Sequence, residues 1–258
     1  MNTYFTVITV CYNAYDDLIK TSESILCQSF CDYEWIIQDG QSNDNTDALC
    51  RDLEKKNSNV AYYSCEDDGI YDAMNKALEK AHGNYIIFMN AGDVFYDQNV
   101  LQNVKDVIDG EPADIYYGNI VETGRNESSL RIYTKKNSKI WYYSLGACLN
   151  HQAMFCRKSL FDKKIFDISY KVCADREWQL YMIRNGFSAK PLGLTVASVL
   201  MDGYSSENVD VLEIETDRCV KKYCGGFYIV YRTIQLLKKS NFLHRIIIRC
   251  EEIVSKRK

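Results

Sequence analysis

The stretch FTVITVCYN, residues 5–13, decides the fold, because an almost unbroken apolar and β-branched run ends there in a polar pair. Such a run predicts a buried strand over residues 5–10. Tyr12 and Asn13 follow directly where this strand ends. The pattern of residues 16–29 then predicts a helix, so the chain opens with a strand, a polar turn and a helix.

Strands and helices continue to alternate along the first third of the chain. Further strands are predicted at residues 34–38, 60–64 and 85–89, with helices that end near residue 56 and span residues 70–81. Short strands that alternate with helices are typical of βαβ units and of a mostly parallel sheet. The less regular second half predicts strands at 114–117 and 153–156, an exposed hairpin or loop over 122–139, and a helix over 175–185. We therefore expect an α/β fold of three layers with Rossmann-like order.

Polar side chains follow four successive predicted strands at the point where each strand ends. The four groups are Tyr12-Asn13, Asp39, Glu66-Asp67-Asp68, and Asn90 to Asp93. The carboxyl ends of parallel strands meet at one edge of the sheet, where open α/β sheets bind their ligands. A single polar strand end could be merely solvated, but four together favour a binding site.

Several familiar kinds of site are absent from the sequence. It contains no GxxxxGK[ST], GxGxxG, HExxH or CxxC pattern, and it has only three histidines. The eleven scattered cysteines are best interpreted as reduced thiols that pack as small apolar residues. The polar side chains that remain as site candidates are mainly carboxylates. Carboxylates can face an anionic diphosphate only if a divalent cation bridges the two negatively charged groups. Oxygen ligands suit Mg²⁺ or Mn²⁺, and sugar transferases use a metal-bridged nucleoside diphosphate as leaving group.

Charge is distributed unevenly along the 258 residues, whose net charge is −4. From Arg218 onward there are eleven basic and two acidic side chains, so the preceding residues carry an excess of thirteen acidic ones. The N-terminus lacks the basic residues of a signal peptide, and no apolar run approaches the roughly 18 residues of a spanning helix. We expect a cytoplasmic protein, and nucleic acid is not among its expected partners.

Five segments in this order resemble the family 2 glycosyltransferases. They are FTVITVCYN, SILCQSFCDYEWIIQDGQSNDNTD, EDDGIYDAMNKALEKAHGNYIIFMNAGD, HQAMFCRKSLF and FDISYKVCADREWQLYMIRNG. The resemblance is close over about the first 95 residues and extends to about residue 186. It implies a GT-A fold and inverting transfer of a hexose or N-acetylhexosamine from a nucleotide-sugar, as expected of a UDP-sugar, to a hydroxyl. Bacterial surface-polysaccharide assembly on a lipid-linked glycan acceptor is the setting that it suggests.

The resemblance also implies roles for individual residues. Thr9, Tyr12 and Asn13 would lie beside the nucleotide base, Asp39 would accept a hydrogen bond from it, and Asp68, Asp72 and Asn75 would line the donor-sugar pocket. The metal motif falls on residues 90–93, but Asn90 and Gly92 replace acidic residues there. This leaves Asp93 as the metal-binding carboxylate and Asn90 among the residues that would bind the nucleotide or donor. Asp175 falls at the position of the catalytic base, although Ala174 stands where a glutamate often precedes it. His151, Trp178 and Ser205 are weaker candidates for acceptor or diphosphate contacts.

Each candidate has a purely structural alternative. Asp39 and Asp175 could cap the helices that follow them, and Asp72 and Asn75 could belong to an ordinary exposed helix face. His151 could be a structural histidine, Trp178 a core residue, and Ser205 part of a plain turn. Two rival functions also stay open: a sugar-phosphate nucleotidyltransferase, which would normally have a Gly- and Arg/Lys-rich loop after the first strand, and a non-catalytic carbohydrate-binding protein.

The C-terminal part is expected to differ from the rest. We predict a transferase domain over residues 1–212 and a basic, helical extension over residues 213–258. Apolar residues follow helical spacing in two stretches of the extension, residues 227–237 and 243–254. Basic amphipathic helices can lie on anionic membranes, so this segment would hold the protein at the inner face of the cell membrane. The alternative is that the apolar stripe packs on the domain itself.

Overall fold

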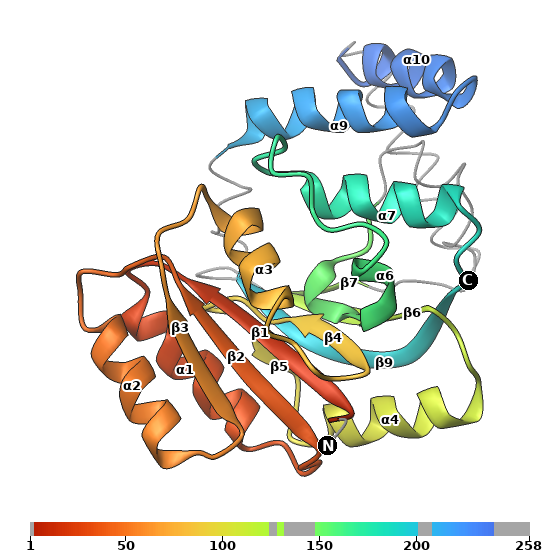
Figure 1. Cartoon of the computed structure of the whole chain (residues 1–258). Helices are drawn as coiled ribbons and strands as arrows, with labels where there is room; N and C mark the ends of the chain where they lie inside the picture. The colour runs from red at the N-terminus through yellow and green to blue at the C-terminus, as the bar shows by residue number, and fades with distance from the viewer. Residues whose placement is uncertain (1–2, 124–127, 132–147, 201–207, 240–258) are drawn as a thin grey trace.

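A computed structural model describes residues 3–123, 128–131, 148–200 and 208–239 (Figure 1). Its strands are β1 (Phe5–Cys11), β2 (Tyr33–Asp39), β3 (Val60–Ser64), β4 (Tyr85–Phe88), β5 (Val94–Phe95), β6 (Ile115–Thr123), β7 (Ser128–Arg131), β8 (Met154–Arg157) and β9 (Ala189–Leu200). Its helices are α1 (Tyr15–Leu26), α2 (Thr46–Lys56), α3 (Ile70–Leu78), α4 (Val100–Gly110), the short 3-10 helix η1 (His151–Ala153), α6 (Lys158–Phe161), α7 (Ala174–Arg184), α9 (Val209–Tyr223) and α10 (Phe227–Lys239).

The described strands form one mixed sheet in the order β3-β2-β1-β4-β8-β6-β9-β5, with β7 paired to β6. Strands β1 to β4 pair in parallel, and the parallel pair β6 and β9 points the same way, because β8 lies antiparallel between β4 and β6. Most strands therefore share one direction, as the alternation of strands and helices predicts. Their carboxyl ends deliver the polar turns to a common edge.

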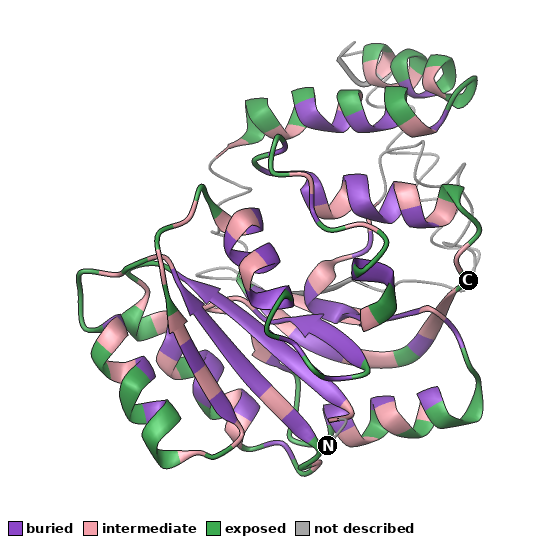
Figure 2. Cartoon of the chain, in the orientation of Figure 1, coloured by how far each residue is buried: buried purple, intermediate pink, exposed green. Residues whose placement is uncertain are grey.

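Helices cover both faces of the sheet, which makes three layers (Figures 1 and 2). All seven residues of β1 are buried, and successive side chains point to opposite faces. Ile8 packs in the core under α3, α6 and α7, whereas Val7 packs in the core under α1, α2 and α4. The GT-A-like, Rossmann-like α/β fold expected from the sequence is confirmed.

The chain beyond β5 contains elements that the sequence pattern does not predict. Helix α4 and the twelve-residue strand β9 are the largest of them. Strand β9 contains Pro191 and Gly193, which are unusual inside strands. It is held by its long pairing with β6, where a Cβ on Gly118 would lie 2.4 Å from Cγ2 of Val196. Only glycine allows this close approach of the two strands.

The C-terminal helices pack back onto the domain. Helix α9 lies against α7, and residue 212, the expected end of the first domain, falls inside α9 (Figure 1). Tyr231 of α10 is buried against this assembly, whereas Phe227 and Val230 of the same predicted apolar stripe are each 47% exposed. The second stretch of helical spacing, residues 243–254, lies outside the described residues. Where the chain is described, no helix combines the length and the apolar character needed to cross a membrane.

Candidate active site

Asp39, at the end of β2, is completely buried and surrounded by donors. Its Oδ2 accepts from the Ser42 amide at 3.0 Å and from the Ser64 hydroxyl at 3.0 Å, and its Oδ1 accepts from the Ser42 hydroxyl. The Tyr62 hydroxyl lies 3.1 Å from Oδ2 of Asp39 and 2.8 Å from Oδ1 of Asp47, so its single proton is shared between the two carboxylates. Asp39 therefore anchors the turn that follows β2 to the neighbouring strand β3.

The turns after β1 and β2 are joined around Asn13. The Asn13 amide donates to the Ser42 hydroxyl at 2.8 Å, and its side-chain oxygen accepts from the Asn43 amide at 2.9 Å. Asn13 has a positive φ of 50°, which asparagine tolerates better than most residues. Tyr12 remains 62% exposed beside this junction. The two turns thus form a hydrogen-bonded floor with an exposed aromatic ring at its margin.

Gly40 brings a third turn to the same place. A Cβ on Gly40 would lie 2.6 Å from Oδ2 of Asp67 and 3.4 Å from the ring of Tyr12. The carboxylate of Asp67, from the turn after β3, therefore approaches the backbone of the turn after β2 directly. The first three predicted polar strand ends do meet in space.

Thr9 and Asn75 lie below this surface. The buried Thr9 hydroxyl donates to the Met89 carbonyl at 2.7 Å and accepts from the Trp35 indole N–H at 2.9 Å. The buried Asn75 amide pairs with the backbone of Phe166, donating at 2.9 Å and accepting at 3.0 Å. Both side chains use their polar atoms to join elements of the fold, so the structure does not bring them to the open edge.

Asp68 and Asp72 do lie at the edge, at the start of α3. The Asp68 amide donates to Asp72 at 3.0 Å, and Lys76 forms an ion pair with Asp72 at 2.7 Å. Burial disfavours the ionised form of Asp72, but the hydrogen bonds from Lys76 and from the Asp68 amide outweigh it and lower its pKa. Asp68 itself is exposed, so this turn presents an ionised acidic surface to the solvent.

A line of polar side chains runs from α7 to the end of β4. Nδ1 of His151 lies 3.1 Å from Oδ2 of Asp175, and Nε2 of His151 lies 3.2 Å from Nδ2 of Asn90. The other oxygen of Asp175 accepts from the Tyr71 hydroxyl at 3.0 Å and from the Arg176 amide at 2.8 Å. An ionised carboxylate only accepts, so His151 donates from Nδ1 and accepts at Nε2 from the Asn90 amide.

These contacts favour the ionised form of Asp175. Burial raises its pKa, but hydrogen bonds from His151, the Arg176 amide and Tyr71, together with the nearby imidazole, outweigh burial and leave the pKa below its usual value. Burial and the adjacent Asp175 charge raise the pKa of Tyr71 well above its usual value, so Tyr71 stays protonated and acts as a donor. Asp175 is therefore a carboxylate at neutral pH, with part of its surface still accessible.

Asp93, three residues after Asn90, is 5% exposed. It accepts from Nε2 of Gln152 at 2.9 Å and, at 3.4 Å, from the Leu200 amide. Burial is the main reason why the pKa of Asp93 is raised to about 6. The side-chain oxygens of Asn90 and Gln152 are buried and have no hydrogen-bond partner. One carboxylate and two unpaired amide oxygens thus come from the same short stretches, residues 90–93 and 151–152.

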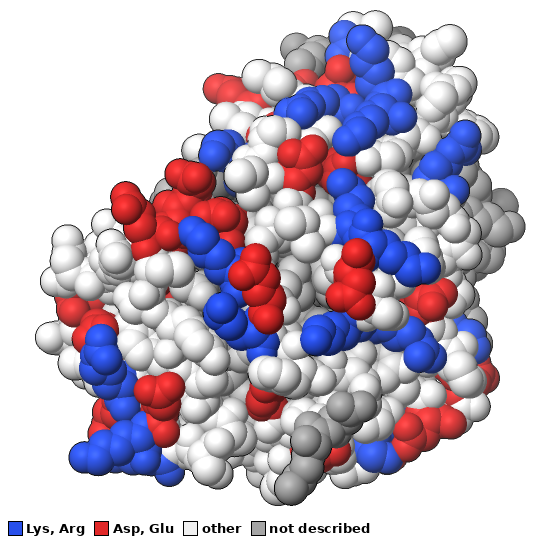
Figure 3. All heavy atoms as spheres, viewed as in Figure 1, with Lys and Arg blue, Asp and Glu red and all other residues white. Residues whose placement is uncertain are grey.

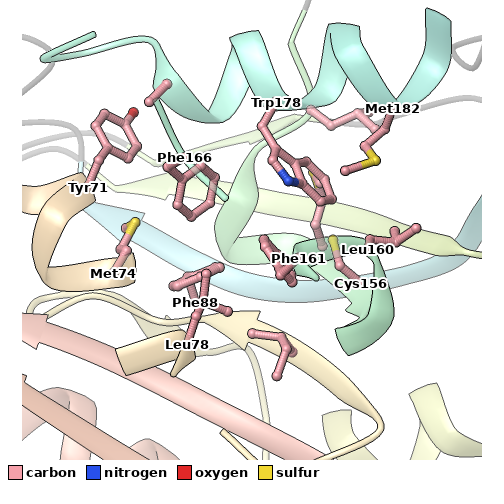
Figure 4. Close-up of a cluster of buried hydrophobic side chains, with 14 of the residues drawn as sticks. Tyr71, Met74, Leu78, Phe88, Cys156, Leu160, Phe161, Phe166, Trp178 and Met182 are labelled. Carbon is pink, nitrogen blue, oxygen red and sulfur yellow. The ribbon is translucent and has the colours of Figure 1, made fainter. Parts of the chain in front are cut away.

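Trp178 belongs to the core rather than to the open edge (Figure 4). Its side chain is 1% exposed, its ring stacks on Phe161 with 4.8 Å between centroids, and its indole N–H donates to the Lys164 carbonyl at 2.7 Å. The core interpretation of this residue therefore fits the structure. Ser205 lies outside the described residues.

Two residues that contact the predicted carboxylates were not predicted from the sequence: Gln152, which contacts Asp93, and Tyr71, which contacts Asp175. Gln152 directly follows His151, and the spacing of the pair on η1 lets one side chain contact Asp175 and the other Asp93. Tyr71 lies in α3, where its aromatic character suggests only a core position, yet its hydroxyl reaches Asp175. No group of three or more His, Cys, Asp or Glu side chains suited to a metal occurs within the described ranges.

Comparison with known proteins gives a consistent picture. A family model described as "Glycosyl transferase family 2" matches residues 6–162. A PGL/p-HBAD biosynthesis glycosyltransferase of Mycobacterium bovis is 27% identical over 184 residues, which is 70% of this chain and 70% of that protein. The glycosyltransferase GlyA of Streptococcus pneumoniae is also 27% identical, over 122 residues, which is 47% of this chain and 17% of that protein.

Solved structures share the fold. The TarS 1-349 structure from S. aureus in complex with UDP superimposes with a TM-score of 0.67 at 19% identity, covering 92% of this chain and 75% of that chain. The mannosyltransferase PcManGT from Pyrobaculum calidifontis, in complex with GDP-Man and Mn²⁺, gives a TM-score of 0.60 at 14% identity, covering 98% and 81%. With its fold, its ordered polar strand ends and a family match over more than half its length, the chain belongs to glycosyltransferase family 2.

Proposed function

We propose that the chain transfers a hexose or N-acetylhexosamine from a UDP-sugar to a hydroxyl of a glycan acceptor, with inversion at the anomeric carbon. The observation that carries the proposal is the ionised, partly accessible Asp175 carboxylate, held on the same edge of the sheet as Asp93. TarS, which shares the fold, has been solved in complex with UDP and with UDP-GlcNAc, and this supports a uridine nucleotide here.

In this proposal Asp175 is the general base. Inverting transfer needs a group that takes the proton of the acceptor hydroxyl as its oxygen attacks the anomeric carbon. Oδ2 of Asp175 is oriented by His151 and Oδ1 by Tyr71, which leaves the carboxylate few orientations. Because the hydrogen bonds lower its pKa, Asp175 is unprotonated and ready to accept a proton at neutral pH.

Asp93 would bind the divalent cation, Mn²⁺ or Mg²⁺. The oxygen atoms of Asp93, Asn90 and Gln152 fit such an ion, because two of these side chains have buried amide oxygens without any partner and hard cations prefer oxygen ligands. Amides at two positions leave the site with less negative charge than a set of carboxylates would give. When bound, the cation would neutralise the charge of the departing diphosphate. The mannosyltransferase PcManGT, solved in complex with Mn²⁺, supports a divalent cation.

The nucleotide would lie over the floor formed by the first two turns. The exposed ring of Tyr12 offers a stacking surface for the base, and Asn13 fixes the turn that carries it. Because Asp39 is completely buried, it can accept a hydrogen bond from uracil N3–H only if a neighbouring side chain turns away, as the Tyr62 hydroxyl can toward Asp47. Asp68 and Asp72 would face hydroxyls of the donor sugar. Thr9 and Asn75 would hold the elements beneath this surface in place through their buried hydrogen bonds.

The C-terminal helices would bring the enzyme to a lipid-linked acceptor at the inner face of the cell membrane. Ile229 and Leu236 of α10 are 72% and 65% exposed, and they point away from the buried Tyr231. Lys and Arg side chains gather at this end of the molecule (Figure 3). An exposed apolar face beside basic residues matches an anionic membrane surface.

The test is a screen of nucleotide-sugars for release of nucleoside diphosphate, with Mn²⁺ and with excess EDTA. We expect release from at least one UDP-sugar, dependent on the cation. Binding of a sugar or nucleotide without any release would instead favour the non-catalytic, carbohydrate-binding alternative. Full activity in EDTA would contradict the metal role of Asp93 but leave the transfer reaction in place.

A further inference from the structure

The turn that carries the base is held by the C-terminal helix α9. Residues 169–173 lead directly into α7, whose first turn contains Asp175. Glu215 of α9 is 7% exposed, and its carboxylate accepts from three consecutive backbone amides of this turn. The distances are 2.6 Å from the Lys171 amide, 2.8 Å from the Val172 amide and 2.9 Å from the Cys173 amide. Figure 1 shows α9 lying beside α7.

Other side chains of α9 contact the same turn. The Arg218 guanidinium lies 4.1 Å from the ring centroid of Tyr170 and donates to the Ser169 hydroxyl at 2.9 Å. Oγ1 of Thr216 lies 3.5 Å from Sγ of Cys173. One face of α9 therefore packs along residues 169–173, the segment that precedes Asp175.

Glu215 and Tyr71 act on the same residue from opposite sides. The Val172 amide donates to Glu215, whereas the Val172 carbonyl accepts from the Tyr71 hydroxyl at 2.8 Å. The same Tyr71 hydroxyl lies 3.0 Å from the Asp175 carboxylate, so its single proton is shared between the Val172 carbonyl and Asp175. The backbone three residues before Asp175 is thus fixed between α3 and α9, and a shift of this backbone would move the carboxylate relative to Tyr71.

We propose that Glu215 is a positioning residue for Asp175, and that α9 is part of the catalytic unit rather than an appended extension. The inference rests on the proposed role of Asp175 as base. A buried carboxylate that accepts three amide hydrogen bonds is a strong local restraint. Replacing one of its oxygens by the NH₂ group of glutamine sets a donor against at least one of these backbone amides, so the turn shifts. Misplacement of a catalytic group by about 1 Å can cost on the order of 100-fold in rate.

The test compares Glu215→Gln with Asp210→Asn, which removes an exposed carboxylate from the first turn of the same helix. Rates of nucleoside diphosphate release are measured for the full chain with the donor that the nucleotide-sugar screen identifies. We expect Glu215→Gln to lower kcat by roughly 10- to 100-fold. The KM for the donor and the Kd for UDP should stay within about twofold, since the hydrogen bonds of Glu215 reach the turn before α7 rather than the turns at the ends of β1 and β2. Asp210→Asn should behave as the unmodified chain.

A double-mutant cycle separates positioning from general destabilisation. When Asp175 is already Asn, Glu215→Gln should change the residual rate by less than about twofold, because there is no base left to misplace. An equal loss with and without Asp175 overturns the proposal, as does an unchanged kcat in the single variant. If Glu215→Gln does not fold, Glu215→Asp takes its place in the same cycle. Wild-type turnover by Asp175→Asn alone would instead refute the base assignment.

Discussion

Replacing Asp93 by Asn should stabilise the metal-free protein while it removes metal binding. Burial raises the pKa of Asp93 from 3.8 to about 6, so the folded protein binds this proton more tightly than the unfolded chain does. The stability that this proton contributes is fully present below about pH 4 and is lost as pH rises through about 6. At about 1.4 kcal/mol per pKa unit, ionised Asp93 costs the folded protein on the order of 3 kcal/mol at pH 8.

The variant recovers only part of this free energy. An Asn side chain can still accept from Gln152, but its NH₂ group would face the Leu200 amide, which is another donor. An unmatched donor costs about 1–3 kcal/mol, so we expect a net gain of up to about 2 kcal/mol in the free energy of unfolding at pH 8. At pH 4 the variant should instead be less stable than the unmodified chain, because folded Asp93 is then protonated and only the cost of the unmatched donor remains.

Urea unfolding in EDTA at the two pH values measures this gain, with Asp16→Asn as the control, since Asp16 is an exposed carboxylate on α1. In a second series, Mn²⁺ should stabilise the unmodified chain and the control but not the Asp93 variant. A variant that is less stable than the unmodified chain at pH 8 in EDTA, or that Mn²⁺ stabilises equally, would refute the reasoning.

Three further predictions concern the base, the nucleotide and the C-terminal surface. Tyr71→Phe removes a donor that lowers the pKa of Asp175, so the acid limb of the pH–rate profile should move to higher pH; an unmoved limb contradicts the role of Tyr71. Asp39→Asn should weaken UDP binding by roughly 10- to 100-fold in calorimetry, and unchanged affinity in a folded variant removes Asp39 from base recognition. Ile229→Ser combined with Leu236→Ser should lower flotation with anionic liposomes at least tenfold, since each large aliphatic side chain contributes roughly 1.5–3 kcal/mol on burial. Ile165→Ser, at another exposed isoleucine, is the control, and equal flotation of both variants rules out the α10 surface.

The first half of the fold was predictable because its structure is local. Strands β1, β2 and β3 are each followed by an amphipathic helix, and predicted boundaries such as residues 5–10 and 60–64 agree with β1 and β3 to within a residue. Strand β9 was not predictable in this way. It contains Pro191 and Gly193, and it forms by pairing Ala189 with Ile115, far away in the sequence.

The edge of the sheet that carries the site was predictable from the sequence. Which candidate side chains are buried beneath that edge was not. The turns after β1, β2 and β3 do meet at one edge, because parallel strands end together. The sequence does not reveal that the Thr9 hydroxyl is used between Met89 and Trp35, since that depends on which strands become neighbours. Glu215 carries no sequence signal either, because an acidic residue in an amphipathic helix normally faces solvent.

Asp175 is the base in the proposed sugar transfer. The most direct test of this role is the rate of nucleoside diphosphate release by Asp175→Asn, measured beside UDP affinity in the same preparation. An Asn side chain still accepts from Tyr71 and the Arg176 amide but has no basicity, so the variant should fold and bind UDP normally. We predict a loss of roughly 10²–10⁴ in rate, as removal of a general base typically gives. Turnover near that of the unmodified chain would contradict this role and leave Asp175 as a residue that only organises the start of α7.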